Sequence, residues 1–167
     1  MIEQQIAANL ENAFSELGFT EPSVATLQKA SGVSLRTLYR YFPSKESMVI
    51  AALEHRHERY LELLAAEPTK QAVFAAFEQL ELWMVHEAPT GCMSMSALAA
   101  YPENPQINAA VKQHKQALLA LFVRFCASEQ LGLQVFLLHE GVSSAWPTIG
   151  DDCIQSAQLT LQLLLGE

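Results

Sequence analysis

The sequence predicts an all-α fold in two parts, and three observations support this prediction. Apolar residues recur three or four positions apart in almost every segment, whereas the alternation expected of strands never lasts. Helix-capping residues, glycines and prolines separate these segments. At 167 residues, the chain is long enough to bury a core and suits one or two small domains.

The first predicted helix spans about residues 2–17. Its apolar stripe consists of Ile6, Leu10, Ala13 and Leu17. Gly18 follows as the stop signal. No basic arm precedes this helix, so contacts with a DNA minor groove are not expected from the N-terminus.

Residues 23–48, SVATLQKASGVSLRTLYRYFPSKESM, are the most specific part of the sequence. Ser23 is a good N-cap for a short helix, and Gly32 suits the sharp turn after it because glycine enters left-handed conformations without a Cβ penalty. Ser34 caps a second short helix, which Pro43 ends. The residues expected on the inner sides are Val24, Leu27, Ala30, Val33, Leu38 and either Tyr41 or Phe42. This is the layout of a helix-turn-helix DNA reader.

Positive charge is concentrated in the same segment. Residues 23–45 contain two lysines, two arginines and no acidic residue, in a protein of net charge -8. Residues 1–60 hold 6 Lys/Arg against 7 Asp/Glu, and residues 61–167 hold 4 against 11. Because most DNA-binding free energy comes from neutralising phosphates, the 23–45 segment is the predicted DNA contact.

The outer face of the second short helix carries the candidate reading residues. Arg36 is predicted to read a base directly, because a guanidinium can bridge guanine O6 and N7. Thr37, Tyr39 and Arg40 can bond bases or phosphates, and the sequence does not separate these roles. Lys45, in the first turn of the next helix, is a predicted phosphate clamp. The ordered combination of caps, turn, proline and clamp favours DNA binding over an ordinary solvated surface.

The stretches GFTEPSV and SGVSLRTLYRYFPSKESM, with the long helix after them, resemble the N-terminal domain of the tetracycline-repressor (TetR) family of transcriptional regulators. The resemblance covers about residues 2–60. It implies a DNA-binding domain at 1–45 and a helical regulatory and dimerisation domain at 46–167, with a linking helix at about 44–66. The predicted DNA-binding residues are Ser23, Ser34, Arg36, Thr37, Tyr39, Arg40, Tyr41 and Lys45.

One residue departs from the family's pattern. Gln28 occupies the position, four before the glycine, where a small alanine usually lets the two helices pack closely. Either the helix crossing is altered, or Gln28 turns outward to the backbone.

Helical spacing continues through the C-terminal part. Further helices are predicted at about 44–66, 69–87, 92–100, from Asn104 and Pro105 to about 125, 130–146 and 152–165. Asp152 and Gln155 have capping-box spacing for the last helix.

The last two predicted helices are apolar on more than one face, so more than one face must be buried. The rest of the same domain or a second copy of the chain can cover them, and the resemblance implies a four-helix dimer interface. The predicted interface residues are Val135, Leu138, Val142, Ala145, Ile154, Ala157, Leu161 and Leu164. Two copies imply a near-palindromic operator.

The resemblance also implies a small-molecule pocket whose occupation releases the DNA. Residues predicted to line it are Phe77, Trp83, Met84, Met93, Met95, Tyr101, His114, Phe122, His139 and Trp146. Each is alternatively a plain core residue, and a reduced pocket, or none, is compatible with the short C-terminal part. The net charge of -7 over residues 61–167 favours a neutral or cationic effector over an anion.

No enzyme is predicted. The sequence shows no glycine-rich phosphate loop, no paired catalytic carboxylates and no nucleophile elbow. His55 and His57 are two positions apart on a helix and would not share a metal, so no metal or cofactor is expected.

The cysteines and the hydropathy indicate a cytoplasmic protein. Cys92, Cys126 and Cys153 show no CxxC spacing, which argues against a disulfide framework. No Lys or Arg lies near Cys92 in the sequence to stabilise a thiolate, so inert buried thiols are expected. Neither a signal peptide nor a membrane span of about 20 residues is predicted.

The sequence thus predicts a homodimeric transcriptional repressor that is released from its operator by a small molecule. Two alternatives stay open. One is a similar DNA-binding protein without an inducer, acting as an architectural or accessory factor. The other is a protein-interaction module that its DNA-binding head localises.

Overall fold

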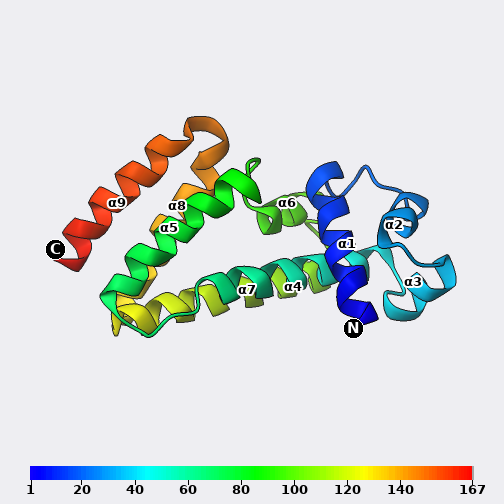
Figure 1. The fold of residues 1–167 in the computed structure, drawn as a ribbon, viewed down its shortest axis with the longest axis horizontal. Helices are drawn as coiled ribbons and strands as arrows, with labels where there is room; N and C mark the ends of the chain where they lie inside the picture. Colours follow the sequence, from blue (N-terminus) through cyan, green and yellow to red (C-terminus); the bar gives the residue numbers. More distant parts are fainter. Residues whose placement is uncertain (167) are drawn as a thin grey trace. The chain divides into compact units, whose positions relative to one another are not determined.

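The computed structural model describes residues 1–166, which hold nine helices and no strand (Figure 1), and the all-α prediction is confirmed. The helices are α1 (Ile2–Leu17), α2 (Val24–Ser31), α3 (Leu35–Tyr41), α4 (Lys45–Leu63), α5 (Lys70–His86), α6 (Met93–Ala100), α7 (Pro105–Cys126), α8 (Glu129–Ile149) and α9 (Asp151–Leu165). Among the described residues, none of these helices is long and apolar enough to cross a membrane.

The boundary between the last two helices differs from the prediction. α8 continues through the exposed Pro147 near its C-terminal end, and this proline lacks the backbone N–H that would otherwise donate to the carbonyl oxygen four residues earlier. α9 therefore begins at Asp151 with Gly150 as its N-cap, and the capping box predicted from Asp152 is wrong.

The residues group into two compact units. The first contains Met1–Tyr60 and Met93–His114, and the second contains Leu61–Cys92 and the described residues from Lys115 onward. The units interleave in sequence, unlike the predicted division at residue 45. Whether residues 1–45 fold as a domain by themselves stays a prediction.

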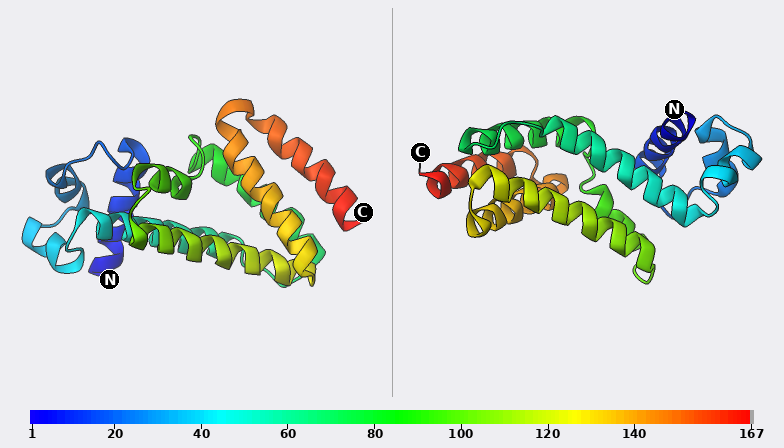
Figure 2. Two further views of the ribbon diagram at one scale, coloured as in Figure 1. Left: turned by 180° about the vertical axis from the view of Figure 1, so that it is seen from behind. Right: turned by 90° about the horizontal axis from the view of Figure 1, so that it is seen from below.

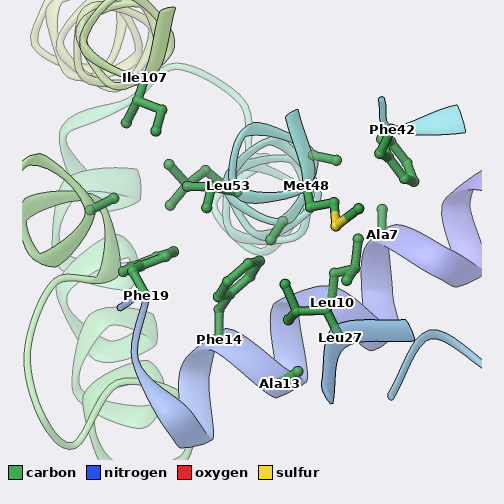
Figure 3. Packing of buried hydrophobic residues seen from close by; sticks show 14 of the residues in the cluster. Ala7, Leu10, Ala13, Phe14, Phe19, Leu27, Phe42, Met48, Leu53 and Ile107 are labelled. Atoms are coloured by element: carbon green, nitrogen blue, oxygen red, sulfur yellow. The ribbon is translucent and has the colours of Figure 1, made fainter. Parts of the chain in front are cut away.

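The first unit is built on one apolar core (Figure 3). Leu10 and Phe14 of α1 pack with Leu53 of α4, and the Phe14 ring stacks on Phe19 with 5.1 Å between centroids. The same cluster includes Leu27 and Leu38 from the two short helices, and Met93, Ala97, Ile107 and Val111 from α6 and α7. The helix-turn-helix is therefore supported by residues up to about 80 positions later in the chain.

Two residues predicted to face inward are exposed instead. Leu17, at the end of α1, and Ala30, on α2, lie on the surface. Glu11 takes an inner position on α1, where it is buried and bonded to three basic side chains of α4. Its carboxylate lies 2.5 Å from His55 Nδ1, 3.0 Å from Arg56 Nη1 and 2.7 Å from Arg59 Nη2. This cluster joins α1 to α4.

The second unit is a packing of α5, α8 and α9 with the end of α7 (Figure 2). α8 and α9 form a hairpin around the turn at Gly150, and their buried residues face each other and α5. α7 and α8 approach closely at Gly132, where an added Cβ would lie 2.5 Å from Val123 Cα.

Candidate DNA-binding site

Local hydrogen bonds set the geometry of the helix-turn-helix, and both predicted N-caps form. The Ser23 hydroxyl accepts from the Thr26 amide at 3.2 Å, and the Ser34 hydroxyl accepts from the Thr37 amide at 3.1 Å. Gly32, between the helices, has φ 73° and ψ 10°, the left-handed conformation that glycine adopts without strain. These contacts fix where α3 begins.

The Gln28 side chain bonds to the backbone of the turn. Its Nε2 donates to the Val33 carbonyl oxygen at 2.6 Å, which corresponds to the second of the two alternatives for this residue. On the other side, Asn9 Nδ2 of α1 donates to the Ser31 carbonyl oxygen at 3.1 Å. Both amide side chains therefore stabilise the turn that orients α3.

α3 has one buried and one exposed side. Leu38 is fully buried in the core of the first unit. Arg36, Tyr39 and Arg40 are exposed, and Thr37 is half-buried. The exposed side carries two guanidinium groups, a phenol and a hydroxyl, which are donors of the kind that bond base edges and phosphates.

Tyr41 contacts both the core and the exposed side of α3. It is half-buried and packs against the apolar cluster. The Arg40 guanidinium lies over its ring, 5.0 Å from the centroid, and Arg40 Nη2 donates to the Tyr41 hydroxyl at 3.4 Å. The tyrosine thus orients Arg40.

Lys45 begins α4, directly after the turn at Pro43 and Ser44. Its Nζ donates to the Thr20 carbonyl oxygen at 3.3 Å, so the ammonium lies by the loop between α1 and α2. The Ser44 hydroxyl accepts from the Ser47 amide at 3.1 Å. The structure places the eight predicted DNA-binding residues in the first unit, and their contacts with DNA stay predictions.

Sequence reasoning left Leu35 out of the site. It is the first residue of α3 and 47% exposed, on a helix whose apolar core position is taken by Leu38. Its place directly after the Ser34 cap is the signal that marks it as a candidate for apolar contact with a base.

The predicted ligand-binding residues divide between the two units. In the second unit, His139 packs against Phe122, with 5.5 Å between ring centroids, and against Phe77 at 6.1 Å. Trp83, Met84 and Trp146 are also buried there. Met93, Tyr101 and His114 belong to the first unit, and Met95 is exposed. The structure therefore brings only part of the predicted set together.

The imidazole of His139 is held neutral by its surroundings. Burial lowers its pKa below the ordinary 6.5, and the neighbouring Glu140 carboxylate only partly opposes this effect. A neutral imidazole both donates and accepts hydrogen bonds.

The predicted dimer residues lie mostly inside the protomer. The structure buries Val135, Val142, Ile154, Ala157 and Leu161 within the single chain, and leaves Leu138, Ala145 and Leu164 half-buried. The buried side chains present no surface to a partner, because α5, α8 and α9 pack on one another.

A cluster that sequence reasoning missed surrounds Lys115 in the second unit. Its Nζ lies 3.4 Å from Cys92 Sγ and 2.7 Å from Glu140 Oε2. The three residues are more than 20 positions apart, so no local pattern reveals the cluster. Within residues 1–166, no group of three or more His, Cys, Asp or Glu side chains is arranged to hold a metal ion.

Comparisons with known proteins agree with the geometry. Residues 8–52 match the family model of bacterial regulatory proteins, tetR family. A 64-residue stretch is 38% identical to the nucleoid occlusion factor SlmA of Haemophilus influenzae, covering 38% of this chain and 29% of that protein. The match thus spans less than a third of the relative's length.

Solved structures resemble the whole chain in fold. A TetR-family transcriptional regulator from Streptomyces coelicolor is 18% identical, with a TM-score of 0.82 over 99% of this chain and 97% of that chain. A tetR transcriptional regulator from Streptomyces avermitilis is 21% identical, with a TM-score of 0.81 over 99% and 97%.

Proposed function

Since the chain is a TetR-family regulator with an N-terminal helix-turn-helix domain, we propose that it acts in the cytoplasm as a homodimeric repressor that binds a near-palindromic operator and is released by a small molecule. The observation that supports this most directly is α3. Arg36, Tyr39 and Arg40 are exposed on a helix whose opposite side is locked into the core by Leu38. In the proposed complex, α3 enters the major groove and Arg36 contacts a guanine.

Selection from a random duplex library tests the DNA-binding part. We expect an enriched inverted repeat, and we expect Arg36→Ala combined with Tyr39→Phe to lose the enrichment while the protein stays folded. Lys29→Ala is the matched control, because Lys29 is exposed on α2 and its loss removes the same single positive charge. The control should only weaken binding and flatten its salt dependence. The assignment of α3 is wrong if the double variant selects the wild-type sequence.

The surface proposed for dimerisation is the set of exposed leucines on α8 and α9. Leu133 and Leu137 of α8 are 45% and 59% exposed, and Leu159 and Leu163 of α9 are 64% and 86% exposed. Four large apolar side chains on two adjacent helices are unusual on a monomer surface and suit a self-complementary two-fold contact.

Introduction of negative charge tests this surface. Leu137→Glu with Leu163→Glu is expected to give a monomer in sedimentation equilibrium and a large loss of operator affinity, because the two half-sites are then no longer bound together. Leu82→Glu is the control, since Leu82 is a similarly exposed leucine on α5. A double variant that remains a dimer would place the interface elsewhere.

The proposed effector binds the second unit near Phe77, Phe122 and His139. Rings around a neutral imidazole suit a largely apolar, uncharged molecule with one hydrogen-bonding group. A thermal-shift screen of such compounds should find one that raises the melting temperature, because a ligand that binds only the folded state stabilises it. The same compound should lower operator affinity, since it must favour the state that does not bind DNA.

One observation favours a second candidate function. The 64-residue match is to a protein named as a nucleoid occlusion factor, so the DNA-binding part is also compatible with a role outside transcription. Mapping of bound sites on the chromosome separates the two functions. A few sites at promoters would support the repressor, whereas many sites away from promoters, with no effector found, would support the alternative.

A further inference from the structure

The exposed side of α3 carries two parallel rows of side chains. Leu35 and Tyr39 are four positions apart, as are Arg36 and Arg40, and residues at this spacing lie on the same side of a helix. All four side chains are exposed, Leu35 to 47% and Tyr39 to 40%. An apolar row therefore lies beside the basic row on the helix that carries the proposed DNA contacts.

The local structure of α3 does not require a leucine at position 35. Leu38 is fully buried and takes the core position of the helix. Ser34 forms the cap, because its hydroxyl accepts from the Thr37 amide at 3.1 Å. Leu35 provides neither the core contact nor the cap. A single exposed leucine is ordinary on a protein surface, but this one continues the row of Tyr39 directly beside the arginines.

The chemistry of the DNA major groove gives this apolar row a partner. Base pairs present hydrogen-bond donors and acceptors there, and their one apolar group is the C5 methyl of thymine. The guanidinium groups of Arg36 and Arg40 suit the acceptors and the phosphates. A leucine that takes water away from a donor or acceptor without replacing its hydrogen bond costs free energy, whereas contact with a methyl group buries apolar surface. The side chain of Leu35 therefore matches thymine better than any other base.

We propose that Leu35 is a specificity-determining residue that reads thymine through apolar contact with its C5 methyl group. The contact lies within the half-site that the same α3 helix binds, and Tyr39 extends the apolar surface beside it. This inference rests on the proposed DNA binding by α3. It deepens that function by naming a base that each half-site of the operator contains.

Replacement of thymine by deoxyuridine tests the inference, because it removes the methyl group and keeps the base-pairing edge. The duplex is the sequence that the wild-type protein selects from the random library, and each thymine of one half-site is replaced in turn. One replacement should weaken wild-type binding by about fourfold, which corresponds to the burial of one methyl group. Leu35→Ala should bind the original and the replaced duplex equally well. Leu35→Met should keep most of the wild-type difference, because its side chain is also apolar.

Leu17→Ala is the matched control, since Leu17 is a 44% exposed leucine at the end of α1. It should respond to deoxyuridine as the wild type does. The comparison also separates methyl contact from an effect of deoxyuridine on duplex shape, because a shape effect would weaken binding by Leu35→Ala as well. All proteins are titrated at one salt concentration, low enough for the weakest variant to bind measurably.

Two results would overturn this inference and leave the proposed DNA binding intact. One is an enriched operator that has no required thymine or that tolerates deoxyuridine at every thymine. The other is a Leu35→Ala protein that keeps the wild-type response to the same replacement. A library from which no sequence is enriched has a different meaning, because it contradicts the proposed DNA binding and, with it, the role of Leu35.

Discussion

The Gly132→Ala substitution has two opposing effects on stability: alanine has the higher helix propensity, but its Cβ would collide with α7. A Cβ on Gly132 would lie 2.5 Å from Val123 Cα, 2.6 Å from Val123 N and 2.7 Å from Val123 Cγ2. Ordinary contacts begin at 3.4 Å, so α8 would have to move away from α7 by about 1 Å in a close-packed interior. Two of the three nearest atoms belong to the backbone, which no rotamer change can move.

Helix propensity and packing predict opposite signs for this substitution. Alanine in place of glycine inside a helix stabilises by about 1 kcal/mol. Overpacking costs about 1–3 kcal/mol, and contact with backbone places this case at the upper end. The expected net loss is about 2 kcal/mol, which lowers the melting temperature of a chain of this size by roughly 4–8 °C.

The assay is thermal and urea unfolding followed by circular dichroism. Wild type and variant are compared at one protein concentration, because dimerisation makes the melting temperature depend on concentration. Val123→Ala in the Gly132→Ala background removes only the Cγ2 contact, so it should not restore stability. A Gly132→Ala protein as stable as the wild type would refute the reasoning, because helix propensity would then outweigh the close approach of α7 and α8.

Four further predictions concern the first unit. Glu11→Gln should destabilise the protein by about 3 kcal/mol in urea melts, because it leaves buried basic groups of α4 without a compensating charge. This figure includes a reduction for Arg59, which is 37% exposed. Glu16→Gln is the control, since Glu16 is exposed on the same helix and its substitution should leave the stability unchanged. Burial by itself raises the pKa of Glu11, but the hydrogen bonds and positive charges of the basic groups outweigh burial and hold this pKa below the ordinary 4.5. The stability that ionised Glu11 contributes is therefore present above pH 4.5 and is lost as the pH falls below 4.5. Acid titration of the Glu11→Gln protein should show a smaller loss of stability over this range. Leu27→Ala should destabilise by about 3 kcal/mol, because Leu27 is fully buried in the core beneath the turn, and urea melts measure this cost. Ser34→Ala should cost about 1 kcal/mol by removing the cap of α3, and an unchanged urea midpoint would contradict the role of this cap.

Local chemistry made the helix-turn-helix predictable from the sequence. Ser23 and Ser34 act as caps with the side-chain bonds that their positions predict, and Gly32 adopts the left-handed turn. Each of these features depends on residues at most a few positions away. The family resemblance and the all-α fold are confirmed for the same reason, because they rest on a dense run of local signals.

The sequence pattern was not sufficient where long-range packing decides which side of a helix is covered. On α1, the inner position of Glu11 is stabilised by basic residues 44 to 48 positions later, which no helical pattern reveals. On α8 and α9, the sequence shows apolar residues on several sides, and the prediction placed the dimer contact on the stripe that includes Val135 and Leu161. The structure buries this stripe in the protomer and exposes Leu137 and Leu163 instead. The pattern established how much apolar surface exists, but not which partner covers each side.

The surroundings of Cys92 show that a spatial neighbour can be distant in the sequence. Sequence reasoning expected an inert thiol because no basic residue lies near it in the chain. In the fold, α7 brings the Lys115 ammonium to 3.4 Å from Cys92 Sγ, across 23 residues. The charges that surround a side chain depend on distances in space, which do not follow from sequence separation. The acidic net charge of the chain says little about the one ammonium group that contacts Cys92, because solvent screens distant charges far more strongly than neighbours in contact.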